Sequence, residues 1–297
     1  MSLDNEASAA LVYLILYTIV FVMLILGYIT RRLKLRSRYS ALTFHVTLRL
    51  VAQAIGLALG IGGFSNINLI ITYFVFGAEG YFTLVLAAFR FLISWQNHNS
   101  PTHDSWLEPK GVSSFQRPMS RMYWLLVAAN AIIIAGGSLL AGGDSQQFAQ
   151  NLPTSKGLRV TGQAIFLLIN TFLLYCILRT IHQSRRENPG RRIHPTLLLL
   201  LAAWPLLFIR GMYGVLAGLL PAFNYFDPSN YTATGFTNSF VTTEYILSTT
   251  MEWTSCVLLL STWYTSRNDP KKADINMVEV ESGKGVAGPT RDSESRT

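Results

Sequence analysis

Long apolar stretches alternate with short polar segments along the whole chain. Seven of these stretches reach about 20 residues, the length that an α-helix needs to cross the roughly 30 Å hydrocarbon core of a bilayer. The pattern therefore predicts an all-α polytopic membrane bundle of seven transmembrane helices, over residues 9–30, 41–64, 69–93, 121–142, 160–181, 196–220 and 241–264.

The other segments have the composition of connections and tails. Residues 94–120 and 221–240 are rich in turn-forming and polar residues, and we expect the second segment to lie at the membrane face as a cap. From residue 265 the chain is polar and poor in aromatic residues, which indicates a disordered cytosolic tail. We therefore expect a seven-helix transmembrane domain over residues 1–264 and a tail over residues 265–297.

The composition excludes an ordinary soluble protein. Only 13% of the residues are charged and 50% are hydrophobic, whereas about 25% of a soluble domain is charged. The net charge of +8 is explained by basic connections between membrane spans, so no nucleic-acid partner is expected. The expected partners are the lipid bilayer and a lipophilic small molecule.

Lys and Arg residues gather in every second connection and in the tail. The segments on the opposite side contain only Lys156 and Arg159. Because cytoplasmic loops have the excess of Lys and Arg, this predicts an outside or lumenal N-terminus and a cytosolic C-terminus. We expect a multi-pass protein of the endoplasmic reticulum or another endomembrane. The sequon at Asn230 falls on the predicted lumenal side and indicates a glycoprotein.

Four ionisable residues lie deep inside predicted spans, where such residues are costly and usually face the bundle interior. Glu79, Arg210 and Glu252 lie at similar depths if each residue adds about 1.5 Å of helix, and Arg49 lies about one turn closer to the cytosol. We predict that they form a cluster. Either they fix the helix register as ion pairs, or they are catalytic and one glutamate stays protonated as a general acid. The first span lacks such residues and is expected to be peripheral.

Aromatic and amide side chains lie at comparable depths on the neighbouring spans. They either pack in the bundle and at the interface, or line a cavity that stabilises a cationic intermediate. The candidate substrate-binding residues are Trp204, Tyr213, Tyr245, Trp253, Tyr81, Asn130 and Asn170.

Several kinds of chemistry find no support in the sequence. Cys176 and Cys256 both lie inside apolar stretches, and no metal-binding motif or phosphate-binding loop is present. No lysine lies inside a span, which excludes a retinal Schiff base. We therefore expect neither a metal nor a cofactor.

Two resemblances suggest a function. The run from Trp204 to Gly214, with Ile134–Gly137 and Met251-Glu252, resembles a fungal family of seven-helix integral membrane proteins of undefined function. A looser similarity is to the integral-membrane terpene cyclases of fungal meroterpenoid pathways, which start cyclisation by protonating an epoxide. This resemblance implies an acidic pair on the third and seventh helices, which Glu79 and Glu252 would supply.

The leading hypothesis is therefore a metal-independent, membrane-embedded terpene cyclase, an isomerase of secondary metabolism. In it Glu79 or Glu252 is the general acid, and Arg210 and Arg49 orient the carboxylates. The alternatives are a seven-helix receptor, a transporter or a scaffold. The predicted topology fits a receptor, but the third span ends in Arg90-Phe91 rather than an Asp-Arg-Tyr-like triplet.

Overall fold

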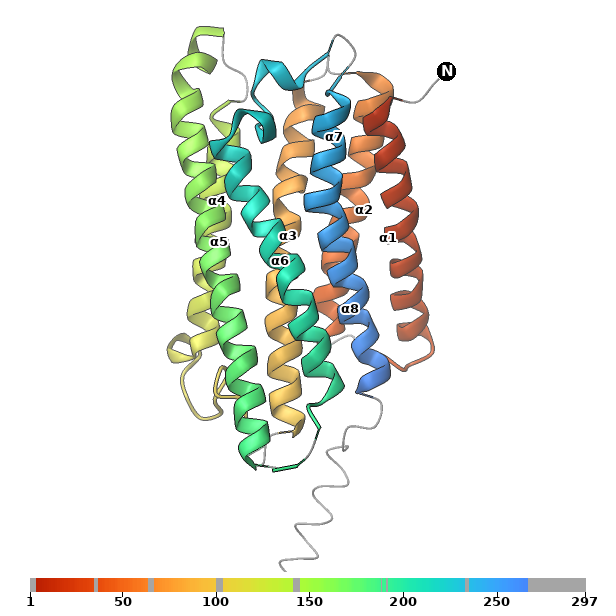
Figure 1. The fold of residues 1–297 in the computed structure, drawn as a ribbon, viewed down its shortest axis with the longest axis vertical. Coiled ribbons are helices and arrows are strands. Elements are labelled where there is room, and N and C mark those ends of the chain that lie inside the picture. The colour runs from red at the N-terminus through yellow and green to blue at the C-terminus, as the bar shows by residue number, and fades with distance from the viewer. Residues whose placement is uncertain are drawn as a thin grey trace, which may run out of the picture.

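The computed structural model is a long bundle of helices that run up and down beside one another (Figure 1). It describes residues 4–34, 37–63, 67–99, 104–140, 145–187, 189–190, 192–232 and 235–266. Apart from two isolated β-bridges, these residues form helices and connections, with no β-strand among them. The helices are α1 (Asn5–Ile29), α2 (Tyr39–Gly62), α3 (Ile67–Asn99), α4 (Pro118–Ser138), α5 (Ser145–Glu187), α6 (Pro195–Leu219), α7 (Asn238–Glu244) and α8 (Met251–Thr265).

The all-helical class predicted from the sequence is confirmed, as are six of the seven predicted apolar spans. Within the described residues, six helices are long and apolar enough to cross a membrane: α1, α2, α3, α4, α5 and α6. The connections between successive helices alternate between the two ends of the bundle (Figure 1). The predicted tail lies, from residue 267 on, outside the described residues.

The predicted seventh span, residues 241–264, is not one regular α-helix. It consists of α7, a π-helical segment η4 (Tyr245–Thr250) and α8, which follow one another without a break. The hydroxyl of Thr250 donates to the carbonyl of Tyr245, five residues earlier, at 2.8 Å. Neither α-helical part alone is long enough to span a bilayer, whereas the continuous helix is.

Helix α5 is much longer than its predicted span of residues 160–181. It begins at Ser145 and contains Pro153 in its first part. Residues 145–159 are mostly polar, so an apolar pattern cannot detect them, although Gln, Ala, Leu and Lys are good helix formers. As a result Lys156 and Arg159, expected in a loop, lie on a helix.

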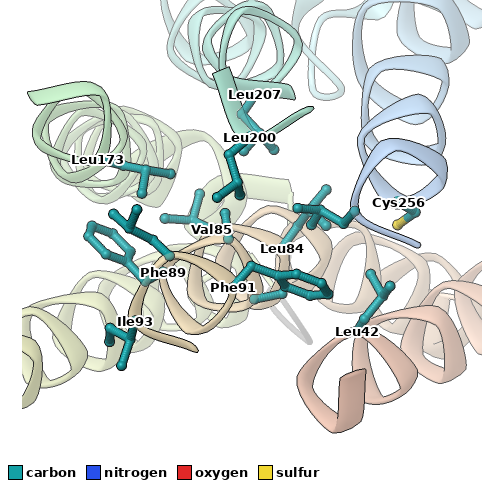
Figure 2. Packing of buried hydrophobic residues seen from close by; sticks show 14 of the residues in the cluster. Leu42, Leu84, Val85, Phe89, Phe91, Ile93, Leu173, Leu200, Leu207 and Cys256 are labelled. Atoms are coloured by element: carbon teal, nitrogen blue, oxygen red, sulfur yellow. The ribbon is translucent and has the colours of Figure 1, made fainter. Parts of the chain in front are cut away.

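Helix α3 is the centre of the bundle. In the 18-residue apolar stretch of α3, 65% of the residues are buried, whereas the corresponding share in α1, at the edge, is 22%. Figure 2 shows Phe89 and Phe91 of α3 packed among side chains of the surrounding helices, including Leu173, Leu200 and Cys256. This apolar core occupies the part of the bundle towards the C-terminal end of α3, and the polar site described next lies towards its N-terminal end.

Apolar side chains also cover the outside of the bundle. Large exposed hydrophobic residues occur on α1, α5, α6 and η4, among them Ile19, Ile29, Leu168 and Ile246. Soluble monomers rarely expose so much apolar surface. The outer surface is therefore compatible with contact to lipid, and the chain is a helical multi-pass membrane protein.

Two short 3₁₀ helices lie over one end of the bundle, in the connection between α6 and α7. They are η2 (Pro221–Phe223) and η3 (Pro228–Asn230), and a third, η1 (Ser114–Gln116), precedes α4. The η2–η3 connection lies at the same end as the N-terminus (Figure 1), as the predicted cap requires.

Candidate functional site

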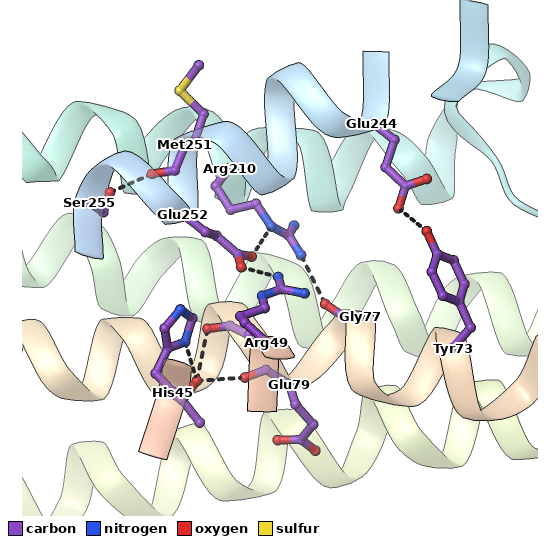
Figure 3. A network of polar contacts seen from close by, with 12 residues as sticks. His45, Arg49, Tyr73, Gly77, Glu79, Arg210, Glu244, Met251, Glu252 and Ser255 are labelled. Carbon is purple, nitrogen blue, oxygen red and sulfur yellow. Dashed lines mark hydrogen bonds and ion pairs between the residues drawn. The ribbon is translucent and has the colours of Figure 1, made fainter. Parts of the chain in front are cut away.

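A buried ion-pair cluster joins α2, α6 and α8. The carboxylate of Glu252 accepts from Nε of Arg210 at 2.6 Å and forms an ion pair with the guanidinium of Arg49 through its other oxygen. All three side chains are at least nine-tenths buried. Figure 3 shows both guanidinium groups converging on this one carboxylate. Such a group holds Glu252 as a carboxylate, because both adjacent partners are cations.

The structure divides the predicted four-residue cluster. Arg49, Arg210 and Glu252 meet, but the side chain of Glu79 points away from them (Figure 3). Its Oε1 accepts from Nδ2 of Asn130 on α4 at 2.6 Å. The prediction rested on depth along the helices, and depth alone does not determine the direction in which a side chain points.

Arg49 reaches Glu252 because α3 has a glycine beside it. A Cβ atom at Gly80 would overlap the Arg49 guanidinium. The same region of α2 contains His45, whose Nδ1 is 2.8 Å from the Thr83 hydroxyl. His45 and Arg49 therefore both face α3, and Gln53, one turn further along α2, is also buried.

A polar cavity of about 60 Å³ lies beside this cluster, towards the end of the bundle that contains the N-terminus. Its walls come from α2, α3, α5, α6, α7 and η4, and the connection after η2 closes it. The charged residues of the wall are Arg49, Lys156, Arg159, Arg210 and Glu244, and the other polar residues include Gln53, Tyr73, Gln163, Tyr213 and Tyr225.

Arg159 of α5 is a cavity cation that packs against aromatic rings. Its guanidinium lies over the rings of Tyr225 and Phe226, at 5.7 and 5.1 Å from their centroids, which is within cation–π range. Among the residues that the structure describes it forms no ion pair. One turn along α5, Oε1 of Gln163 is buried without a hydrogen-bond partner in the described part of the chain.

A second pair of acids lies next to the cavity. Glu6 of α1 is fully buried and Glu244 of α7 is 7% exposed. The hydroxyl of Tyr73 on α3 lies 2.9 Å from Oε1 of Glu6 and 3.3 Å from Oε1 of Glu244. Tyr245 donates to Glu6 at 2.9 Å and Tyr225 donates to Glu244. Figure 3 shows Glu244 turned towards Tyr73.

The predicted substrate-binding residues occupy different surroundings. Tyr213 lines the cavity, and Tyr245 belongs to the hydrogen bonds around Glu6. The guanidinium of Arg210 lies over the ring of Tyr81, with Cζ of Arg210 5.5 Å from the ring centroid. The remaining residues are away from the cavity wall: Trp204 donates to the carbonyl of Asn170 at 2.8 Å, Trp253 packs against the apolar core, and Asn130 binds Glu79.

Asn230, the predicted glycosylation site, is 6% exposed. Its Nδ2 donates to the carbonyls of Pro221 and Asn224, both at 2.8 Å. The side chain thus holds the cap together, and a glycan on Nδ2 would disrupt these bonds.

Several residues of the site are not among the candidates predicted from the sequence: Glu6, Tyr73, Arg159, Tyr225 and Glu244. Glu6 lies before the first predicted span, residues 9–30, and that span was expected to be peripheral. A usable signal was present, because Asp4 caps the helix at Asn5 and so places Glu6 inside it. Tyr225 lies in an irregular connection, whose path no periodicity predicts.

Among the described residues, no group of three or more His, Cys, Asp or Glu side chains could hold a metal ion. The fold and the site together define a class: a helical multi-pass membrane protein with a charged cavity inside its bundle. No protein-family model, curated protein or solved structure matches the chain.

Proposed function

We propose that this membrane protein binds a small amphipathic molecule through an anionic group, in the cavity between α2, α3, α5, α6 and α7. The observation that carries the proposal is Arg159, a cavity cation without a carboxylate partner in the described residues. Function as a receptor or a carrier for such a ligand follows directly from this kind of site.

The distribution of charge supports an anionic ligand. Arg49 and Arg210 share the carboxylate of Glu252, so together these three groups retain one positive charge. Arg159 and Lys156 add two more cations to the wall, whereas Glu244 is its one acid among the described residues. The guanidinium of Arg159 is also held in place by two aromatic rings, so little freedom is lost when an anion binds.

The size of the cavity favours a compact head group. A volume of about 60 Å³ exceeds the roughly 10–15 Å³ that one water molecule needs, and suits a carboxylate or a phosphate. An apolar tail of the ligand would lie outside this space, between helices or in the bilayer.

We propose that the cavity end of the bundle is lumenal, and that the membrane is the endoplasmic reticulum or another endomembrane, because the basic segments gather at the opposite end.

The test uses the full chain in nanodiscs of phosphatidylcholine. Decanoate and decyl phosphate are the probes, and decanol and decyltrimethylammonium are the neutral and cationic controls. We expect an anionic probe to bind and to raise the unfolding temperature. Arg159→Gln should weaken that binding about tenfold or more, since a hydrogen bond to a charged group is lost.

Arg185→Gln is the matched control, because Arg185 is exposed near the other end of the same helix. Equal binding of all four probes, or an equal loss of binding in both variants, would show that binding depends on the apolar chain of the probes and not on their negative charge. The anion proposal would then be wrong.

A second candidate function is the acid-catalysed cyclase suggested by the resemblance. It is favoured by the pair Glu6 and Glu244, because Glu244 lines the cavity and neither acid forms an ion pair within the described residues. In this mechanism a carboxyl group donates its proton to an epoxide oxygen and the C–O bond breaks. An alkene then supplies the electron pair of the new C–C bond, and loss of a proton yields an isomer of unchanged mass.

Mass spectrometry of cells that are fed prenylated epoxides tests this candidate. A cyclised isomer that is lost with Glu244→Gln, at normal membrane abundance, would support it. Glu79→Gln and Glu252→Gln test the two acids predicted from the sequence, and Glu187→Gln on the exposed end of α5 is the control. Unchanged substrate across the panel, with folded protein in the membrane, would reject the cyclase.

A further inference from the structure

Glu6 and Glu244 are two buried acids that share one hydroxyl group. Glu6 comes from the first helix and Glu244 from α7, and the Tyr73 hydroxyl lies within 3.3 Å of both carboxyl groups. We propose that the two side chains form a proton-binding site that holds one proton in the folded protein and thereby fastens α1 to α7.

The hydrogen bonds around the pair leave room for this proton. Tyr73, Tyr225 and Tyr245 each have a single hydroxyl proton, and all of them approach Oε1 of one acid or the other. The second oxygens, Oε2 of Glu6 and Oε2 of Glu244, are buried without a hydrogen-bond partner in the described residues. A protonated carboxyl group is itself a donor, so an added proton supplies what these oxygens lack.

The charges that face the pair do not neutralise two carboxylates. On α2 and α6, Arg49 and Arg210 bind Glu252. On α5, Arg159 stacks on aromatic rings, and Lys156 lines the cavity without an ion pair to either acid in the described residues. The other polar or charged groups facing it are Asp4 before α1, Gln53 on α2, Tyr73 on α3, Tyr213 on α6, Tyr225 in the connection and Tyr245 on η4. None of these adds a cation.

Two ionised carboxylates without an adjacent cation are very unfavourable in a buried site, and pairs of this kind retain one proton. The contrast with Glu252 is informative, since that carboxylate is equally buried but has two arginine partners. Removal of the proton at high pH would leave two repelling charges between α1 and α7. The stability that the pair contributes is therefore present at low pH and lost as the pH rises through the value at which the proton leaves.

Thermal unfolding of the full chain in a nonionic detergent, from about pH 5 to about pH 9, tests the proposal over the range documented for buried carboxyl groups. The unfolding temperature of the wild type should fall by about 3 °C per pH unit once the proton leaves. Glu6→Gln and Glu244→Gln each remove one of the acids, so their unfolding temperatures should lose this dependence. Glu108→Gln, in the connection before α4, should keep the wild-type profile.

Infrared spectroscopy of the wild type keeps the proposal testable if a Gln variant does not fold. A band of a protonated carboxyl group should be present at neutral pH and disappear over the same pH range as the stability. Parallel pH profiles for the wild type and both Gln variants, or no protonated carboxyl band in the wild type, would overturn the proposal. No ligand is used, so this outcome is independent of whether the cavity binds an anion.

Discussion

Glu252 organises the polar interior because three helices depend on its charge. It is fully buried, and Arg49 of α2 and Arg210 of α6 bind its two oxygens. The desolvation of these groups is offset only while all three are present. The cluster therefore fixes the positions of α2, α6 and α8 relative to one another, which also fixes one wall of the cavity.

Loss of the Glu252 charge should destabilise the protein strongly. Glu252→Gln leaves two buried guanidinium groups without a carboxylate, and breaking a buried pair costs about 3–5 kcal/mol. Glu108→Gln breaks the partly exposed 3.2 Å pair with Arg90 and should change stability by less than about 1 kcal/mol. Thermal unfolding in detergent and membrane abundance measure both effects. Wild-type stability of Glu252→Gln would show that the cluster does not hold the helices together.

The same residues show how far sequence reasoning reaches. Arg49, Arg210 and Glu252 were predicted to meet because charges in a membrane require partners, and they do. Glu79 also has a polar partner, but this partner is the neutral amide of Asn130. The rule requires a partner and does not say whether that partner is charged. Arg159 was assigned to a loop because polar helix turns beyond a membrane span have no apolar signature.

At the scale of elements, the π-helical segment η4 brings two acids to the same side of one helix. In a regular α-helix of about 3.6 residues per turn, side chains eight positions apart point about 80° away from each other. An extra residue in a π-helical turn reduces this angle to roughly 20°. Glu244 and Glu252 can therefore both face the interior, one towards Tyr73 and the other towards the arginines (Figure 3). The sequence predicted the span but contained no signal for its π-turn.

The contact between α1 and α2 depends on a glycine. A Cβ atom at Gly60 would lie 2.6 Å from the backbone nitrogen of Ala7, which cannot move without the helix, whereas Gly62 has open space. Replacing glycine with alanine raises the helix propensity at both positions. Gly60→Ala should nevertheless destabilise the protein by about 1–3 kcal/mol through overpacking, and Gly62→Ala should not.

Thermal unfolding of both variants measures this difference. Because Ala7 adjoins Glu6, displacement of α1 by Gly60→Ala should also weaken the pH dependence of unfolding. Equal stability of the two variants would mean that α1 adjusts its position freely against α2.

At the scale of the whole molecule, the two ends of the bundle differ in charge and in chemistry. One end has the cap, the carboxyl pair and the cavity, and the other has most of the Lys and Arg residues that the structure describes. The alternation of apolar spans was sufficient to predict that the basic connections share one end, because each span reverses the chain direction. The cavity itself was not predictable, since its wall combines side chains from six separate elements and a connection.

The charge difference makes the orientation testable. If the basic end faces the cytosol, protease added to sealed microsomes should remove a tag at the C-terminus and leave a tag at the N-terminus intact. Both tags should be digested after detergent is added. Replacing Arg31, Arg32, Lys34 and Arg38 with Gln removes charges beside the first span and should yield a mixed population. Digestion of the N-terminal tag in sealed microsomes would reverse the orientation, and the cavity would then lie at the cytosolic end of the bundle.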